Sequence, residues 1–195
     1  MQYQKAVYLT SAVEMKGLPK DSGAEVAFIG RSNSGKSSAL NTITGIKGLA
    51  RTSSMPGRTQ MINLFELDKS HRLVDLPGYG YAKVPKPVQK RFEAFTHEYL
   101  EKRESLCGIV LIMDVRHPMK EMDQELISWS ASCGLPMHIL LTKADKLKKI
   151  PQQNALFTVK DAVKVFPNVS VQLFSSLNRV GIDEAKKQLD LWFNS

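Results

Sequence analysis

The sequence predicts an α/β protein in three layers, with a mostly parallel six-stranded sheet flanked by helices. Apolar, strand-like runs alternate with amphipathic, helix-like segments along most of the chain, which is typical of parallel sheets. The runs at 108–113 and 137–141 are almost wholly apolar, as expected for central strands that are covered on both faces. Because ligands of such sheets bind at the carboxyl ends of the strands, we look for a site in the loops that follow them.

The elements are expected in one domain, residues 23–195, preceded by an irregular extension, residues 1–22, that packs on it. The expected strands are 25–29, 61–67, 71–74, 108–113, 137–141 and 169–174. The expected helices are 38–43, 88–103, 119–132, 151–165 and 181–193. The stretch 45–59 has neither helical nor strand periodicity, and loops of this length inside a domain are usually functional.

Composition narrows the class of protein. The chain has 195 residues, 43% of them hydrophobic and 24% charged, so it can bury a core and is not a disordered tail. Neither a membrane-spanning run nor the apolar core of a signal peptide is seen, so we expect a cytoplasmic protein. Cys107 and Cys133 adjoin apolar segments without metal-ligand spacing, which favours buried reduced thiols.

The net charge of +8 favours a phosphate-rich partner, although a merely soluble basic surface fits it as well. Basic residues gather after residue 80 and again after residue 145, as Lys83, Lys86, Lys90 and Arg91, and as Lys146, Lys148 and Lys149. The first group would suit the phosphates of a nucleic acid, and the alternative is a solvated helix face.

The most informative stretch is GRSNSGKS at 30–37, which follows an apolar run and precedes a helix. Strand, G-x-x-x-x-G-K-S and helix together form the phosphate-binding P-loop pattern. Gly30 and Gly35 let consecutive N–H groups converge on phosphate oxygens, and the helix N-terminus adds partial positive charge. Lys36 is expected to neutralise the β- and γ-phosphates, and the Ser37 hydroxyl to bind Mg²⁺. The loop residues are Gly30, Arg31, Ser32, Asn33, Ser34, Gly35, Lys36 and Ser37.

Two further features suit the same phosphate chemistry. Asp75 stands at a strand end, where its carboxylate can hold Mg²⁺ through water, and Gly78 can offer its N–H to the γ-phosphate. Thr59 lies between the P-loop and Asp75, where its hydroxyl can close on Mg²⁺. Taken alone, Asp75 suits a turn cap and Thr59 an exposed loop position, so the combination carries the argument.

The segment TKAD at 142–145 indicates the base. The Asp145 carboxylate can accept hydrogen bonds from N1–H and the 2-amino group of guanine, whereas adenine would leave a buried carboxylate unpaired. The Lys143 stem can lie along the base, and residues 175–177 can aim N–H groups at guanine O6. In isolation, a helix-capping role for Asp145 is an alternative.

In this order, these motifs resemble those of Ras-like GTPases of the translation-factor class, and more narrowly the bacterial EngB (YihA/YsxC) family of the TrmE–Era–EngA–YihA–septin-like group. The segments that carry the resemblance are 25–38, 56–60, 75–80, 114–118, 142–145 and 174–176. The resemblance implies a three-layer P-loop GTPase fold. It also implies a GTP- and GDP-binding protein that assists assembly of the large ribosomal subunit, with ribosomal RNA and ribosomal proteins as partners, and that is needed for normal cell division and septation. We expect a monomer.

The resemblance also implies site roles. Mg²⁺ would be the cofactor, with Ser37 and Thr59 as its protein ligands. Beyond the P-loop, the nucleotide would be lined by Gly57, Arg58, Thr59, Gln60, Met61, Asp75, Leu76, Pro77, Gly78, Thr142, Lys143, Ala144, Asp145, Phe174, Ser175 and Ser176. Lys36, Thr59, Gly78 and Asn33 would take part in catalysis.

Hydrolysis is expected to be slow, because Tyr79 stands where Ras-type enzymes carry the Gln that orients water. Asn33 occupies the P-loop position where some relatives in this group use an Asn to coordinate K⁺. The alternative for Asn33 is a hydrogen bond within the loop. A switch that acts through a protein partner stays open as a second function. A metabolic kinase has little support, because no acceptor-substrate lid is visible.

Overall fold

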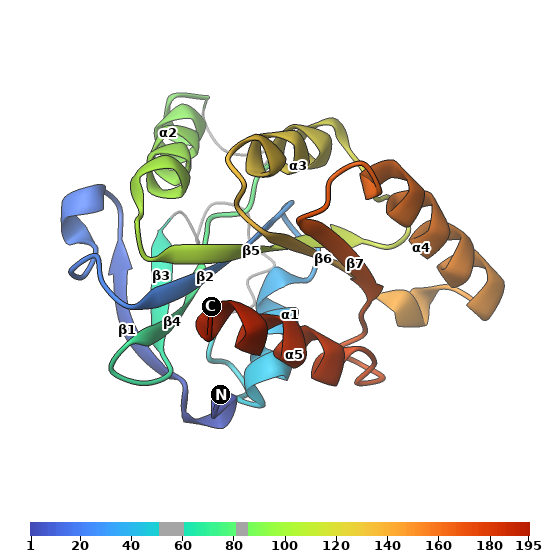
Figure 1. Ribbon diagram of the computed structural model, residues 1–195, viewed down its shortest axis with the longest axis horizontal. Helices are drawn as coiled ribbons and strands as arrows, with labels where there is room; N and C mark the ends of the chain where they lie inside the picture. Colours follow the sequence, from blue (N-terminus) through green and yellow to red (C-terminus); the bar gives the residue numbers. More distant parts are fainter. Residues whose placement is uncertain (51–60, 81–85) are drawn as a thin grey trace.

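The computed structural model describes residues 1–50, 61–80 and 86–195. In these residues a seven-stranded sheet runs in the order β1-β3-β4-β2-β5-β6-β7, with helices on both faces (Figure 1). The pairs β1–β3 and β3–β4 are antiparallel, and the others are parallel. The predicted three-layer α/β fold with a mostly parallel sheet is confirmed, with one strand more than expected.

The bounds of the elements follow the predicted alternation of strand and helix. The strands are β1 Val7–Ala12, β2 Ala24–Gly30, β3 Ile62–Glu66, β4 His71–Asp75, β5 Leu106–Asp114, β6 Met137–Thr142 and β7 Val169–Leu173. The α-helices are α1 Lys36–Thr44, α2 Lys86–Lys102, α3 Glu121–Ser132, α4 Lys149–Val163 and α5 Ile182–Phe193. Short 3₁₀ turns are η1 Tyr3–Lys5, η2 Met15–Gly17 and η3 Ala144–Lys146.

The additional strand lies in residues 1–22, which the sequence analysis expected to be irregular. That expectation is wrong for β1, which pairs antiparallel with β3 from Val7↔Glu66 to Ala12↔Ile62. β1 lies at the edge of the sheet, and Val7 and Tyr8 are more than half exposed. An edge strand needs no continuous apolar run, so the pattern was missed. The domain boundary at residue 22 stays a prediction.

Alternating residues of β2 build two cores. Val26 and Phe28 pack with α1 and α5 on one face of the sheet. Ala27 and Ile29 belong to the other core, which includes side chains of α2, α3 and α4. Figure 1 shows this division, with α1 and α5 on one side of the sheet and the other three helices opposite. Burial on both faces explains why β2 and β5 read as apolar runs.

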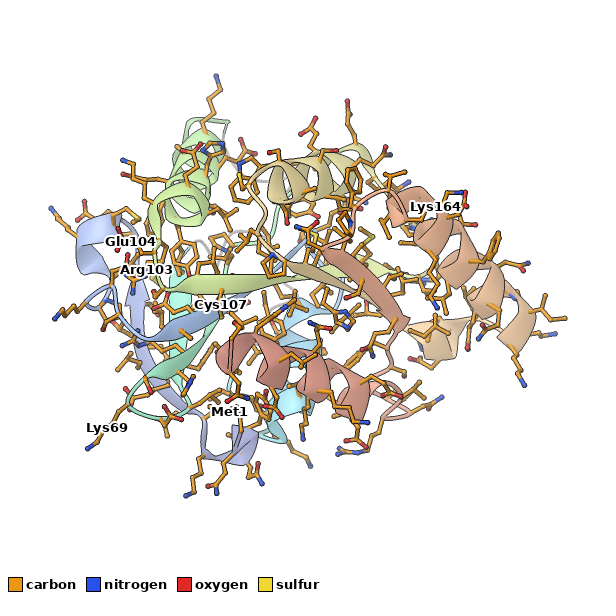
Figure 2. All side chains as sticks on the ribbon, in the orientation of Figure 1. Met1, Lys69, Arg103, Glu104, Cys107 and Lys164 are labelled. Atoms are coloured by element: carbon orange, nitrogen blue, oxygen red, sulfur yellow. The ribbon has the colours of Figure 1, made fainter. Side chains whose placement is uncertain are left out.

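A buried ion cluster fastens α2 at the amino end of the parallel strands. The Glu25 side chain of β2 is fully buried and lies 2.7 Å from Arg103 Nη2 and 3.1 Å from Arg72 Nη1. The Tyr99 hydroxyl of α2 donates to the second Glu25 oxygen at 2.9 Å. Figure 2 shows Arg103 where α2 gives way to β5. The two guanidinium groups balance the charge of this buried carboxylate, and the hydrogen bonds satisfy its oxygens, as burial of a charge requires.

The two cysteines are free and differ in exposure. Cys107 is half-buried, and burial raises the pKa of its thiol to about 11. Cys133 is exposed, so the expectation of a buried thiol is wrong there. No helix in the described part of the chain is long and apolar enough to cross a membrane.

Candidate nucleotide-binding site

The predicted motifs meet at the carboxyl ends of the parallel strands. β2 leads into the P-loop, β4 ends at Asp75, and β6 ends at Thr142. Because these strands are parallel through β2–β4, β2–β5 and β5–β6, their ends lie at one edge of the sheet. β7 brings residues 174–176 to the same edge (Figure 1).

The P-loop backbone takes a curved course that only certain residues allow. Asn33 and Gly35 have positive φ angles of 62° and 101°. A Cβ on Gly30 would lie 2.4 Å from the Ile112 carbonyl oxygen, so β2 and β5 approach too closely there for any side chain. Ser34 is buried, and within the described residues its hydroxyl has no hydrogen-bond partner. An unpaired buried hydroxyl beside curved backbone suits a loop that binds an oxygen-rich ligand such as phosphate.

Lys36 and Asp75 face one another beside this loop. The Lys36 ammonium donates to Asp75 Oδ1, and the side chains are 10% and 2% exposed. Ser37 follows at the second position of α1 and is half-buried. A hydroxyl and a carboxylate are the hard oxygen donors that Mg²⁺ prefers, so the residues present fit this ion.

At the other end of the site, Asp145 is oriented by Ser175. The Ser175 hydroxyl donates to Asp145 Oδ1 at 2.6 Å, and Lys146 Nζ lies 3.6 Å from Oδ2. Ser175 is itself fixed by backbone hydrogen bonds of 3.1 and 3.0 Å with Val180. Lys148, which makes no side-chain cap hydrogen bond, occupies the N-cap position of the following helix, so Asp145 is not its N-cap. The carboxylate is fixed in orientation by Ser175, and its role toward guanine stays a prediction.

Two side chains join residues 142–145, the candidate base-binding loop, to the P-loop. Lys143 has a positive φ of 57°, and its ammonium donates to the Asn33 carbonyl at 2.6 Å and lies 3.0 Å from Asp114 Oδ2. The Thr142 hydroxyl bonds to the carbonyls of Ser34 and Met113. Although burial opposes it, hydrogen bonds from Arg116 and Lys143 hold the pKa of Asp114 well below its ordinary value. Asp114 therefore stays charged and keeps Lys143 in place.

Tyr79 is turned away from the phosphate site. Its phenol donates to the Asp123 carboxylate at the start of α3, and both residues are buried. Its backbone joins the P-loop: the Ser32 N–H donates to the Tyr79 carbonyl at 2.8 Å, and the Tyr79 N–H to the Gly30 carbonyl at 3.2 Å. Burial raises the pKa of Tyr79, and the nearby charge of Asp123 raises it further, so the phenol remains a donor at neutral pH.

The structure brings together the predicted residues 30–37, 75–78, 142–145 and 174–176. Leu76 and Phe174 are fully buried in the cores, so their backbone rather than their side chains is available to a ligand. Met61 precedes β3 and is 38% exposed. Gly57, Arg58, Thr59 and Gln60 lie outside the described residues, and their roles stay predictions.

Sequence reasoning assigned no role to two carboxylates of the site, Asp114 and Asp123. Asp114 stands in the segment 114–118, which entered the resemblance, but only the structure pairs it with Lys143. Asp123 lies in α3 with no motif around it, and its contact with Tyr79 joins residues 44 positions apart. For Asp123 no local pattern was available to reveal the contact.

A P-loop, a strand-end aspartate and an oriented guanine-type aspartate at the edge of a parallel sheet define a P-loop GTPase. A family model described as "50S ribosome-binding GTPase" matches residues 25–143. The "Probable GTP-binding protein EngB" of Coxiella burnetii (strain CbuG_Q212) is 59% identical, over 99% of this chain and 95% of that protein. The protein of the same description from Glaesserella parasuis serovar 5 (strain SH0165) is 52% identical, over 99% of this chain and 93% of its own length. The chain belongs to the EngB family of GTP-binding proteins.

Solved structures share the fold. A crystal structure of a probable GTP-binding protein engB superposes with a TM-score of 0.70 and 23% identity, and covers 88% of this chain and 99% of that one. Era in complex with MgGDPNP and nucleotides 1506-1542 of 16S ribosomal RNA gives a TM-score of 0.67 with 21% identity, covering 88% of this chain and 57% of Era. Family membership assigns GTP binding and, in general terms, GTP hydrolysis to the chain.

Proposed function

We propose that the chain is a slow, monomeric, cytoplasmic GTPase switch that assists assembly of the large ribosomal subunit and thereby supports cell division and septation. The observation that carries the switch is the fixed pairing of a P-loop with an Asp145 carboxylate oriented by Ser175. The ribosomal partner rests on the family model described as "50S ribosome-binding GTPase" and on the net charge of +8.

In this proposal each end of the site binds one end of GTP. Asp145 accepts from guanine N1–H and the 2-amino group, and the P-loop N–H groups and Lys36 bind the phosphates. Ser37 and Thr59 would hold Mg²⁺ directly and Asp75 through water, and the ion would neutralise charge that develops on the phosphates. The solved Era complex with MgGDPNP, which has the same fold, supports this choice of metal.

Slow hydrolysis follows from what the Tyr79 side chain contacts. The O–H of its phenol is engaged with the buried Asp123 carboxylate, so the side chain is held at α3 and is not directed at an attacking water. Lys36 and the Gly78 N–H would stabilise charge on the γ-phosphate, but water orientation would depend on another group. The Asn33 side chain is exposed and has no hydrogen-bond partner within the described residues, so it is available as a ligand for K⁺. We include K⁺ in the proposal as an activator.

The test is cosedimentation with purified large-subunit particles on sucrose gradients, with a non-hydrolysable GTP analogue, with GDP or without nucleotide. We expect the analogue-bound form to associate best and the association to weaken steeply with salt. Replacing Lys83, Lys86, Lys90 and Arg91 together with Glu should abolish it without lowering GTP affinity; Lys83 lies outside the described residues. Absence of association in every nucleotide state would contradict the proposal, and salt-insensitive capture of a protein would favour the protein-partner switch.

A further inference from the structure

Helix α4 exposes large apolar side chains on the face that points away from the sheet. Ile150 and Phe157 are 74% and 72% exposed, and their spacing of seven residues places them on one helix face, two turns apart. The opposite face buries Val159 and Val163 in the core beside β7. Packing in the core does not explain two large apolar side chains that point outward on one helix face. This face is therefore a candidate interaction surface.

Positive charge surrounds these apolar residues. Lys148, Lys149 and Lys160 are exposed, and within the described residues no carboxylate lies within ion-pair distance of any of them. Asp161 on the same face is paired with Lys164 at 2.6 Å. The first turn of α4 contains no acidic residue, although acids there would favour the helix and lysines oppose it. Lys148 and Lys149 therefore add nothing to helix stability, whereas Lys160, in the last turn, is favourably placed.

We propose that this surface, the α4 face, docks the RNA of the ribosomal partner; the inference rests on the proposed function. The α4 face consists of Lys148, Lys149, Ile150, Gln153, Phe157 and Lys160, with the Asp161–Lys164 ion pair at its C-terminal end. Unpaired lysines suit phosphates, an exposed aromatic ring suits stacking on an unpaired base, and a Gln amide can bond to base edges or sugars. RNA offers all three kinds of contact, whereas an acidic protein surface offers no base to stack on Phe157.

The α4 face is held independently of the loops that contact the γ-phosphate. The Gln152 amide donates to the carbonyls of Ala144 and Leu147, at 2.8 Å each, and so fixes the start of α4 to the base-binding loop. The rest of the helix packs on β7. The α4 face is therefore expected to bind RNA equally in the GTP and GDP states, as an anchor, while nucleotide-dependent binding arises elsewhere.

The experiment compares two variants that carry the same change of net charge. The first changes Lys148, Lys149 and Lys160 to Glu. The control changes Lys16, Lys20 and Lys69 to Glu, all exposed and outside the α4 face. Figure 2 shows Lys69, one of the control positions, on the opposite side of the molecule from Lys164, which directly follows α4. GDP affinity and urea unfolding report whether each variant remains folded.

Binding is measured to large-subunit particles and, in parallel, to purified 23S ribosomal RNA. We expect the α4 variant to lose at least about tenfold in affinity in both nucleotide states, with a log–log salt slope shallower by about two to three. The control should stay within about twofold of wild type, because it changes the long-range field but not the contact surface. Phe157→Ala should lower affinity by about fivefold or more without changing the salt slope, since stacking is not ionic.

Wild-type affinity of the α4 variant, or equal weakening of the two triple variants, would overturn the inference. So would loss confined to the GTP-analogue state, which would assign the surface to the switch. If wild type binds neither particles nor free RNA, both proposals fail. If it binds free RNA through the α4 face but not particles, the α4 face is an RNA-binding surface and the ribosomal function fails.

Discussion

At the scale of single residues, the proposed guanine selectivity depends on the Asp145 carboxylate, whose orientation is set by the Ser175 hydroxyl. Asp145→Asn replaces one acceptor oxygen by an N–H donor opposite the guanine 2-amino group, so GTP affinity should fall by about two orders of magnitude or more. Xanthosine triphosphate should gain, because its 2-carbonyl accepts from the new amide. Titration with fluorescent GTP, ATP and xanthosine analogues measures both effects. Equal affinity of the wild type for ATP and GTP would contradict the assignment of Asp145.

Asn33 gives a residue-scale test of the potassium hypothesis. The carbonyl of this residue is engaged with Lys143, while its side chain is exposed. We expect GTP turnover of the wild type to be faster in potassium chloride than in matched sodium chloride, because K⁺ would offset charge developing on the phosphates. Asn33→Ala should remove the difference but retain GDP binding. Identical wild-type rates in the two salts would contradict the potassium hypothesis. An arginine or a partner would then have to supply the missing positive charge.

At the scale of elements, Tyr79 joins the loop after β4 both to the P-loop and to α3. Burial holds the pKa of Tyr79 above that of an unfolded tyrosine, so above about pH 10 the unfolded chain ionises at this residue and the folded one does not. Stability gained from the protonated phenol is therefore present below that pH and is lost as pH rises.

Tyr79→Phe tests this connection. The variant should lose about 1–3 kcal/mol of unfolding free energy at neutral pH, because Asp123 loses a buried donor. Above pH 10, its stability should fall less steeply than that of the wild type, by about 1.4 kcal/mol per pH unit. The variant should keep the part of the alkaline slope that comes from Tyr3 and Tyr99, whose pKa values are also raised by burial. Urea unfolding across pH measures both, and parallel alkaline slopes would refute the connection.

At the scale of the whole molecule, the Glu25 cluster connects segments far apart in the sequence. Arg103 donates to Glu25 from the end of α2 and to the Pro19 carbonyl at 3.0 Å. Arg103→Met should destabilise the fold by about 3–5 kcal/mol, because Glu25 is left buried with fewer cationic partners. Lys102→Met, at the neighbouring exposed position paired with Glu98, should leave the midpoint of urea unfolding nearly unchanged. Similar midpoints of urea unfolding for the two variants would contradict this role.

Sequence alone predicted the fold, and it identified the motifs of the candidate site where local chemistry is decisive. The P-loop glycines, Asp75 and Asp145 belong to short motifs whose spacing reflects one turn or one strand end, so they could be identified directly. β1 was missed because an exposed edge strand carries little apolar signal. The contacts of Glu25, Asp114 and Asp123 were not predicted, since each joins residues brought together only by the sheet order.

The links from Thr142 and Lys143 to the P-loop carbonyls have a consequence for affinity. They make the proposed base site and the proposed phosphate site parts of one rigid receptor, so a ligand with both ends would attach its second end at a high effective concentration. Guanosine alone and pyrophosphate alone should therefore bind far more weakly than GDP, even in combination. A variant that lacked either hydrogen bond would keep both half-sites but would lose the gain in affinity that comes from holding them together.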